Sequence, residues 1–360
     1  MSDKKGLPRV EYEDIISGAG RLNKDIKLKE SEKVGIVFHK GDVLYGKLRP
    51  YLQNWLLASF NGLAVGDFWV LQPQNTDSSF LYRLVQSQQF DGVANQSTGT
   101  KMPRADWKLV SKTKFAMPHS VDEQAAIGAY FEHLDTLITL HQRKYEKLVN
   151  IKKSMLDKMF PQNGASVPEI RFKGFTDPWE QRKVGTLIED YTEKTVTQNQ
   201  YPVLTSSQQQ GIVLQEDYFA DRQVTTDNNV GYYVLPKGYF TYRSRSDTDV
   251  FVFNRNNIVD KGIISYYYPV FAPKSCDSNF LLRRLNHGIK KQLSMAAEGT
   301  GQKVLAHAKF KNMVVDVPSQ SEQEKIGTIL EELDTLITLH QRKLEKLQNI
   351  KKSCLEKMFV

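Results

Sequence analysis

The chain has 360 residues, of which 40% are hydrophobic and 25% are charged, and its formal net charge is +8. At about 150 residues per domain, this length predicts two globular domains. No tract of 18 or more residues is apolar, and the start of the chain lacks the apolar core of a signal peptide. We therefore expect a cytoplasmic protein without a membrane partner. The positive charge favours a polyanionic partner such as nucleic acid, although charge alone is weak evidence.

The two cysteines, Cys276 and Cys354, lie in different settings, one in an expected loop and one in an expected helix. Neither has a metal-ligand neighbour at the spacing of a zinc site. Both are predicted to be free reduced thiols, in preference to a disulfide or a metal site.

Residues 1–121 are expected to form a first globular unit of the α+β class. Short runs rich in β-branched and aromatic residues, separated by Gly, Asn, Pro and Asp, predict strands. These runs are Val34–His39, Asp42–Tyr45, Leu63–Gln72 and Lys114–Met117. Phe80–Phe90 places its apolar residues on one face and is predicted to be a helix.

A stretch of 38 residues occurs twice, as Glu123–Phe160 and as Glu322–Phe359, with 28 identical positions at a constant offset of 199. Such a repeat indicates a duplicated module. Apolar residues recur at spacings of three and four, which predicts a long amphipathic helix over 122–160 and another over 319–360. Ser120 or Asp122 can cap the first helix.

Each long helix needs a partner for its apolar stripe, and at 1.5 Å per residue it would extend about 57 Å. We expect the two helices to pair with each other as an antiparallel coiled coil about a pseudo-twofold axis. His141 and His340 on the stripe are expected to be packed, not catalytic or metal-binding. In the first copy the stripe is Ile127, Phe131, Leu134, Ile138, His141, Tyr145, Leu148, Ile151, Met155 and Met159; its counterparts in the second include Leu333, Ile337, His340, Leu344 and Leu347.

Pro161–Gly164 is expected to end the first helix, and residues 161–318 to form the second globular unit. Its predicted strands are Tyr201–Leu204, Tyr232–Leu235, Tyr239–Arg243, Val250–Phe253 and Gly262–Tyr268, and its predicted helix is Phe280–Met295. The pattern of Phe38–Tyr45 matches that of Leu235–Tyr242. The globular parts differ while the helices are nearly identical, as expected for one scaffold that carries two different recognition heads.

Each globular unit has a basic segment after a strand, Tyr45–Tyr51 or Thr241–Ser246, and a Gly/Thr loop with a lysine, Ser97–Arg104 or Glu298–Lys303. Glycine permits close backbone approach, while Arg and Gln can contact phosphates and base edges. Either loop alone suits an ordinary basic surface, but recurrence in both units favours DNA contact. The candidate DNA-binding residues are Lys40, Lys47, Arg49, Tyr51, Thr100, Lys101 and Arg104 in the first unit, and Lys237, Tyr242, Arg243, Arg245, Thr300, Gln302 and Lys303 in the second.

Signatures of catalysis are missing from the sequence. It contains no GxxxxGK[ST] nucleotide loop, no GxSxG turn and no HExxH helix. We predict no catalytic or metal-binding residues, and a self-contained nuclease is a less favoured alternative. Two recognition heads without a site for chemistry suit a targeting subunit.

Five stretches together resemble the specificity (S) subunit of bacterial type I restriction-modification enzymes, over nearly the whole chain. They are the repeated LDTLITLHQRK helix, the EQ pair before it, KLRPY, GTGQK, and RFKGFTDPWEQRKVG at Arg171–Gly185. The resemblance implies two target-recognition domains that each read half of a bipartite DNA target, held apart by two antiparallel helices.

The same resemblance implies partners. Two methyltransferase (M) subunits would dock on the helices and domains, and restriction (R) subunits would join through this M/S core. The chain itself would be non-catalytic and hold no cofactor, because S-adenosylmethionine, ATP and magnesium belong to the partners.

The second unit departs from the first at its start. Because Lys40-Gly41 aligns with Lys237-Gly238, Arg171–Gln200 has no counterpart before Met1. The first recognition domain is therefore expected to be shortened. It could be impaired in recognition, leaving a scaffold or decoy that binds methyltransferase subunits, or another chain could supply the missing strand.

Overall fold

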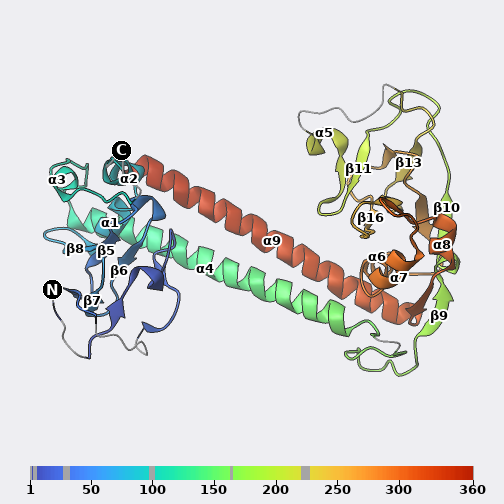
Figure 1. Ribbon diagram of the computed structural model, residues 1–360, viewed down its shortest axis with the longest axis horizontal. Helices are drawn as coiled ribbons and strands as arrows, with labels where there is room; N and C mark the ends of the chain where they lie inside the picture. The colour runs from blue at the N-terminus through green and yellow to red at the C-terminus, as the bar shows by residue number, and fades with distance from the viewer. Residues whose placement is uncertain are drawn as a thin grey trace. The chain divides into compact units, whose positions relative to one another are not determined.

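The computed structural model describes residues 2, 6–26, 33–96, 102–162, 165–219 and 228–359. The chain divides into two compact units: unit 1 comprises Met1–Lys144 and His340–Val360, and unit 2 comprises Tyr145–Leu339. Helices and strands occur in both units, which confirms the α+β class (Figure 1).

Unit 1 is built on two three-stranded sheets. One has the order β6–β5–β8 and is antiparallel, and the other has the order β1–β7–β4. Three short helices follow in the chain. The bounds are β1 Arg9–Val10, β2 Ile15–Ile16, β3 Arg21–Leu22, β4 Ile36–Phe38, β5 Val43–Gly46, β6 Trp55–Leu57, β7 Gly62–Ala64, β8 Phe68–Leu71, α1 Ser78–Leu84, α2 Gln88–Ala94 and α3 Trp107–Val110, with 3-10 turns at Tyr12–Asp14 and Pro50–Leu52.

Three predictions for unit 1 need correction. The strand expected at Leu63–Gln72 is two strands, because Gly66 adopts φ 100° between β7 and β8. The single helix expected at Phe80–Phe90 is α1 followed by α2. Ser87 separates them, since its hydroxyl donates to Leu84 O (2.7 Å) and accepts from the backbone N–H of Phe90 (3.2 Å), an N-cap arrangement. Lys114–Met117 is not a strand, and it has no partner strand among the described residues.

Unit 2 is centred on a four-stranded antiparallel sheet of order β10–β18–β14–β16. Around it lie the strand pairs β9/β20, β11/β12, β13/β17 and β15/β19. The bounds are β9 Glu180–Lys183, β10 Ile188–Tyr191, β11 Leu204–Ser207, β12 Gly211–Leu214, α5 Gln215–Tyr218, β13 Tyr233–Pro236, β14 Phe240–Tyr242, β15 Arg245–Ser246, β16 Phe253–Arg255, β17 Lys261–Ile264, β18 Val270–Pro273, α6 Ser278–Asn286, α7 Lys290–Ala296, β19 Lys303–Val304, α8 His307–Asn312 and β20 Val314–Val317, with a 3-10 turn at Val184–Thr186.

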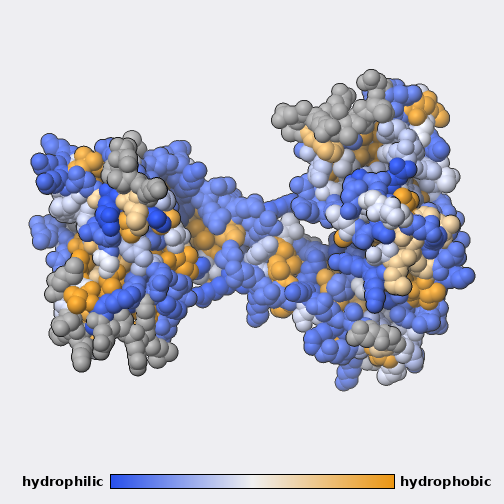
Figure 2. Space-filling view, viewed as in Figure 1, coloured by the Kyte–Doolittle hydropathy of each residue, from blue (hydrophilic) through white to orange (hydrophobic). Residues whose placement is uncertain are grey.

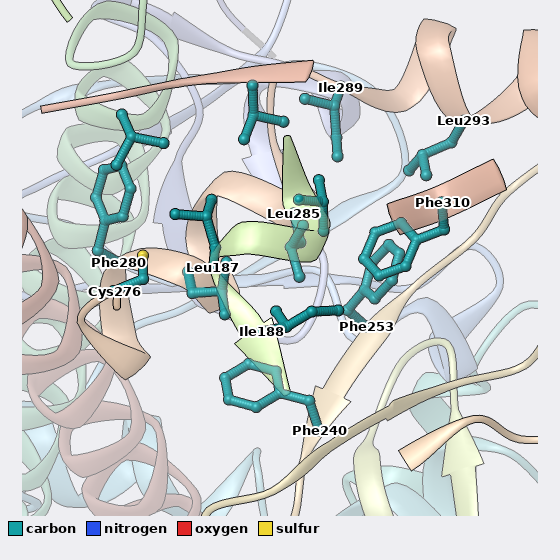
Figure 3. Packing of buried hydrophobic residues seen from close by; sticks show 14 of the residues in the cluster. Leu187, Ile188, Phe240, Phe253, Cys276, Phe280, Leu285, Ile289, Leu293 and Phe310 are labelled. Carbon is teal, nitrogen blue, oxygen red and sulfur yellow. The ribbon is translucent and has the colours of Figure 1, made fainter. Parts of the chain in front are cut away.

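The core of unit 2 lies between the central sheet and the helices α6 to α8. Figure 3 shows Phe240 and Phe253 from the sheet, Leu285 from α6, Leu293 from α7 and Phe310 from α8 directed into it. Phe253 and Phe310 are stacked with ring centroids 4.8 Å apart. Cys276 also belongs to this core; burial, with the nearby charge of Asp277, raises the pKa of its thiol to about 12. Both Cys276 and Cys354 are free.

The predictions for unit 2 place most elements but shift their ends. The strands expected at Tyr201–Leu204 and Val250–Phe253 begin at Leu204 and Phe253, and the strand expected to reach Tyr268 ends at Ile264. The helix expected at Phe280–Met295 is divided into α6 and α7. Gly288 lies between them with φ 84°, which no helix accommodates.

The two repeats form the helices α4, Val121–Lys158, and α9, Gln320–Met358, and each contributes to both units. Ser120 caps α4, because its Oγ accepts from the backbone N–H of Glu123 (3.4 Å), whereas Asp122 lies inside the helix. The breakers Asn163 and Gly164 lie outside the described residues. Figure 2 shows mostly hydrophilic residues on this face of α4 and α9.

Within unit 1 the segments of α4 and α9 pack antiparallel, because residue numbers rise along α4 as those of their contacts fall along α9. Tyr130 Oη lies 3.8 Å from Cys354 Sγ, Asp135 Oδ1 lies 2.6 Å from Lys351 Nζ, and His141 Nδ1 lies 2.8 Å from His340 Nδ1. The residues predicted for the stripe are buried or half-buried: Leu134, Ile138, His141, Tyr145, Leu148, Leu333, Ile337, His340, Leu344 and Leu347.

The predicted stripe is wrong at one position. Ile151 is 38% exposed, and its neighbour Lys152 is half-buried instead, paired with Asp334. A lysine can occupy this inward position because a carboxylate from α9 neutralises it.

The same contacts recur in the two units at offsets of 199 or 200 residues. In unit 1, Asp135 accepts from Arg83 (2.7 Å) and Lys351 (2.6 Å). In unit 2, Asp334 accepts from Arg283 and Lys152. Each repeat also ends on a buried phenylalanine: Phe359 packs on Phe80 in unit 1 (5.3 Å between ring centroids) and Phe160 packs on Phe280 in unit 2 (5.9 Å).

Candidate nucleic-acid interface

In unit 2 a two-stranded pairing brings the basic segment and the Gly/Thr loop together. β15 pairs with β19, so that Arg245 lies opposite Val304 and Ser246 opposite Lys303. The backbone N–H of Leu305 donates to Ser244 O (2.8 Å) and continues the pairing. Residues about 60 positions apart in the sequence therefore form one cluster.

The exposed side chains of this cluster carry cations, an amide and aromatic rings. Gln302 Nε2 donates to Asp247 Oδ1 (2.9 Å), and the guanidinium of Arg243 lies 4.0 Å from Asp247 Oδ2. The guanidinium of Arg245 lies over the ring of Tyr267, 4.6 Å from its centroid. Such groups suit contact with phosphates, with base edges and with base faces.

The sequence did not single out Asp247, Tyr266 or Tyr267 as site residues. Tyr266 and Tyr267 are 53% and 44% exposed, and the Tyr266 hydroxyl donates to that of Tyr267 (3.0 Å). The run of three tyrosines at 266–268 is the signal that could have indicated them, because consecutive aromatics in a half-buried segment must leave some rings in solvent.

The Gly/Thr loop of unit 2 is closed at its base by Glu298 and Val304, whose backbone groups exchange hydrogen bonds of 3.0 and 2.8 Å. Gly299 has φ 119°, and a Cβ there would lie 2.2 Å from Gln302 O, so only glycine fits this turn. Thr300 and Gln302 are exposed on the loop, and Lys303 is half-buried on β19.

Two predicted residues of unit 2 lie outside the cluster. Tyr242 is 0% exposed, its ring lies among Phe253 and Phe310, and its hydroxyl lies 3.3 Å from His307 Nδ1. Burial raises the pKa of Tyr242. The prediction that Tyr242 contacts DNA is therefore wrong for this fold, because the side chain is a core residue. Lys237 lies before β14, at the strand end away from Arg243, with its Nζ 3.8 Å from Asp260 Oδ1.

Unit 1 has the equivalent pairing. Leu48 and Arg104 form an isolated antiparallel β-bridge. On either side of it, the backbone N–H of Arg49 donates to Pro103 O (2.7 Å) and that of Ala105 donates to Lys47 O (2.8 Å). The KLRPY segment and the residues after the loop therefore lie side by side, which brings Lys47, Arg49 and Arg104 together.

Asp67 organises the cations of this second cluster. Its carboxylate lies 3.6 Å from Lys47 Nζ and accepts from Arg104 Nε (3.2 Å) and Nη2 (3.0 Å). Tyr12 supports the segment, since its hydroxyl donates to Asp67 O (2.8 Å) and accepts from the backbone N–H of Leu48 (2.8 Å). Burial raises the pKa of Tyr12. The sequence indicated neither Asp67 nor Tyr12, because both act through contacts that only the fold creates.

The other DNA-binding residues predicted in unit 1 lie in different settings. Arg49 adopts φ 49°, and its buried Nε has no hydrogen-bond partner among the described residues. Tyr51 is 56% exposed beside it. Lys40 is exposed before β5, at the strand end away from Lys47. Thr100 and Lys101 lie outside the described residues.

Over the described ranges, no group of three or more His, Cys, Asp or Glu side chains is arranged to hold a metal ion. Among the helices that the structure describes, none combines the length and apolar character of a membrane span.

Comparison with known proteins gives a consistent set of similarities. The family model for the type I restriction modification DNA specificity domain matches residues 177–349. The EcoDI specificity subunit of Escherichia coli is 25% identical over 127 residues, covering 34% of this chain and 28% of that protein. The MjaVIII specificity subunit of Methanocaldococcus jannaschii is 23% identical over 289 residues, covering 72% of this chain and 64% of that protein.

This chain thus spans 28% and 64% of the lengths of these two relatives. A solved structure, the type I restriction-modification S subunit from M. genitalium, aligns with a TM-score of 0.52 over 100% of this chain and 90% of that one, at 14% identity. At that identity the similarity is one of fold.

Proposed function

We propose that this chain, whose residues 177–349 belong to the type I restriction modification DNA specificity domain family, is the non-catalytic subunit that directs a type I restriction-modification enzyme to its DNA target. The observation that carries this proposal is the recurrence of one arrangement in both units. In each, a backbone pairing joins a basic segment to another part of the chain, the residues Met102–Arg104 in unit 1 and the end of the Gly/Thr loop in unit 2. Each pairing leaves an exposed arginine beside an aspartate, Arg104 beside Asp67 and Arg243 beside Asp247.

The target would be bipartite, with residues 1–121 and 161–318 as two recognition domains that each read one half. Residues 122–160 and 319–360 would form an antiparallel coiled coil about a pseudo-twofold axis and set the spacing of the half-sites. The matched ion pairs at Asp135 and Asp334, and the half-buried stripe, support this arrangement. DNA repeats about every 34 Å, so heads held apart by a rigid spacer of tens of ångströms could address major grooves about one turn apart.

The partners would be double-stranded DNA, two methyltransferase subunits docked on the helices, and restriction subunits joined through that core. Exposed apolar residues at equivalent positions of the two repeats support a pair of equivalent docking surfaces: Leu140 is 56% exposed and Leu339 is 49% exposed. Methyl-donor, nucleotide and metal chemistry would then belong to the partners, in the cytoplasm.

A second candidate is a scaffold that binds methyltransferase subunits without reading both half-sites. The observation that favours it is confined to unit 1, where Lys114–Met117 lacks a strand partner among the described residues. The two candidates differ in the DNA that the assembled complex modifies.

The test replaces Arg245 with alanine and maps methylated sites in a host that contains only this system. Loss of a side chain that contacts a base edge should cost about 1–3 kcal/mol and relax one position in one half-site. Lys274→Ala, at an exposed lysine just after β18 and at the end of that strand away from Tyr267, is the control and should leave the motif unchanged.

Equal loss at both half-sites would argue against separate heads. A complex of wild-type chain and methyltransferase that binds random DNA without sequence preference, and without weakening as salt is raised, would favour the scaffold.

A further inference from the structure

In unit 2, two tyrosines occupy the tip of the turn that joins β17 to β18. The backbone N–H of Tyr268 donates to Ser265 O (2.9 Å), so Tyr266 and Tyr267 are the two central residues of a β-turn. Gly, Pro, Asn and Asp dominate such positions, and departures from a local preference are expected at functional sites. Both rings are largely in solvent, so core packing does not explain their presence.

Tyr267 supports the arginine of the β15/β19 pairing. The guanidinium carbon of Arg245 lies 4.6 Å from the centroid of the Tyr267 ring. Two hydrogen bonds hold Tyr267 itself, since Ser244 Oγ donates to its backbone oxygen (2.7 Å) and the Tyr266 hydroxyl donates to its hydroxyl (3.0 Å). The position of the ring, and with it that of the guanidinium, is therefore set by contacts of the turn.

A ring holds an arginine without using its hydrogen-bond donors. A carboxylate accepts N–H groups and so occupies them, whereas the face of a ring attracts the positive charge and leaves the N–H groups at the guanidinium edge available. Arg245 is exposed, and among the described residues its side chain forms neither a hydrogen bond nor an ion pair. It therefore presents an oriented fork of donors to solvent.

Unit 1 holds an arginine at the equivalent position by an ion pair. Leu71 and Phe271 pair with equivalent residues of β5 and β14, and Asp67 and Tyr267 lie four positions before them. Asp67 accepts two hydrogen bonds from the guanidinium of Arg104 (3.2 and 3.0 Å). The same position of the turn thus anchors an arginine in both units, by a carboxylate in one and by a ring in the other.

The backbone pairing beside this turn also corresponds between the units. It joins Leu48 to Arg104 in unit 1 and Arg245 to Val304 in unit 2. Each pairing has one arginine and one aliphatic residue, and the arginine comes from opposite segments in the two units. Since both arginines are exposed, the fold presents one anchored arginine at this place in each unit.

We propose that Arg245, oriented by Tyr267, reads one guanine in the half-site bound by unit 2 by donating two N–H groups to its O6 and N7 atoms in the major groove. Guanine is the base that offers two adjacent acceptors there, and the planar guanidinium matches both. Adenine and cytosine place an amino donor at this edge, and thymine offers one acceptor. Tyr267 is a positioning residue. The inference rests on the proposed function and names the base pair that one side chain selects.

The experiment uses the full chain assembled with the methyltransferase subunits of its own system, after the motif has been mapped from methylated sites. Affinities are compared for duplexes that carry each base pair at the position concerned. Arg245→Ala should reduce the preference for the G·C pair about 5- to 150-fold, the range for a bidentate contact. Tyr267→Leu should reduce it about two- to fivefold, whereas Tyr267→Phe, which keeps the ring, should retain it. Lys274→Ala, at an exposed lysine beyond the other end of β18, is the control.

A modified base gives a readout that a merely structural role would not change. Replacing that guanine by 7-deazaguanine removes the N7 acceptor and keeps the base pair. The wild type and Tyr267→Phe should bind this duplex about tenfold more weakly, because one charge-assisted hydrogen bond is lost. Arg245→Ala should bind the two duplexes equally.

A motif that Arg245→Ala leaves unchanged, or that relaxes at an A·T pair, would overturn the proposal, as would equal binding of both duplexes by the wild type. The proposed function would stand in each of these cases, because the wild-type complex would still read its motif. Wild-type preference in Tyr267→Leu would overturn the positioning role of Tyr267. A wild-type complex without any sequence preference would contradict the proposed function and this inference with it.

Discussion

Gly128 and Gly327 occupy the same position in the two repeats, and each lies where a side chain would collide with a neighbouring helix N-terminus. A Cβ on Gly327 would lie 2.4 Å from Asp277 Oδ1 and 2.9 Å from Asn279 Cβ. Asp277 Oδ1 is the cap of α6, since it accepts from the backbone N–H of Phe280 (2.8 Å). A Cβ on Gly128 would lie 2.6 Å from Ser79 Cβ in the first turn of α1. These glycines allow each long helix to pack closely on the short one.

Gly327→Ala is therefore expected to destabilise the protein by about 1–3 kcal/mol through overpacking, although alanine favours helices by about 1 kcal/mol. The measurement is the midpoint of urea denaturation. The control is Gly92→Ala in α2, where a Cβ would meet nothing within 4 Å and stability should rise. A Gly327→Ala protein as stable as the control would contradict the close packing.

At the scale of residues, the sequence selected Arg49, Arg104 and Arg245 as DNA-binding candidates from the recurrence of basic segments in both units. The fold places Arg49 beside Arg104 and Arg245 on β15, and their contact with DNA stays a prediction. Tyr242 was misassigned because β14 is buried on both faces, so alternation does not distinguish inward from outward side chains. Asp67 could not be predicted, because its role depends on a contact with a residue 37 positions away.

The histidine pair is the feature of the long helices that should respond to pH. His141 Nδ1 and His340 Nδ1 lie 2.8 Å apart, a hydrogen bond that requires one of the two nitrogens to lack a proton. Burial, together with Lys144, His141 and Lys343, lowers the pKa of His340. An unfolded histidine titrates near 6.5, so below that pH the unfolded chain binds more protons than the folded chain.

Stability from this pair should be full above about pH 6.5 and should fall as the pH drops toward the lower folded pKa. We expect the melting temperature of the wild type to decrease between pH 7.5 and 5.5 by more than that of His340→Gln. His133→Gln, at an exposed histidine of α4, is the control and should keep the wild-type slope. Parallel pH profiles for wild type and His340→Gln would refute this role.

At the scale of elements, the sequence predicted helices, whose pattern is local, and was wrong where a strand or a buried side chain depends on a partner elsewhere in the chain. The helical period of the repeats is a local property, and α4 and α9 have the predicted extents to within a few residues. Lys114–Met117 has the composition of a strand, but within the described ranges no neighbouring strand pairs with it. Lys152 faces inward only because Asp334 lies opposite it, which the spacing of apolar residues does not reveal.

At the scale of the whole molecule, each unit includes the end of a repeat. Phe359 packs with Phe80 and Phe131 in unit 1, at 5.3 and 6.2 Å between ring centroids. Phe160 packs with Phe280 and Trp179 in unit 2, at 5.9 and 6.1 Å. The core of unit 1 therefore depends on residues from both ends of the sequence.

Phe359→Ala is expected to cost about 3–5 kcal/mol, the usual range for a buried phenylalanine. Amide exchange should accelerate chiefly in Ser78–Leu84 of unit 1. Phe160→Ala is the matched variant and should accelerate exchange chiefly in Ser278–Asn286 of unit 2. If both variants loosened the same helix, the assignment of each phenylalanine to its unit would be wrong.

The duplication and the two units follow from the sequence, because the repeat divides the chain plainly. The division of each long helix between the units does not follow, since it depends on where the second copy returns in space. Unit 2 is one continuous segment, Tyr145–Leu339, whereas unit 1 combines Met1–Lys144 with His340–Val360.

The division of the chain between the units determines the order in which the units can complete their folding during synthesis. Translation proceeds at about 5–20 residues per second, so roughly 200 residues between α4 and Phe359 delay the completion of unit 1 by about 10–40 s. During that interval Phe80 and Phe131 lack the ring that covers them, while unit 2 can close as soon as its own segment emerges. The unit that begins synthesis first therefore finishes folding last, and until Phe359 arrives its nascent form exposes apolar surface of the kind that chaperones bind.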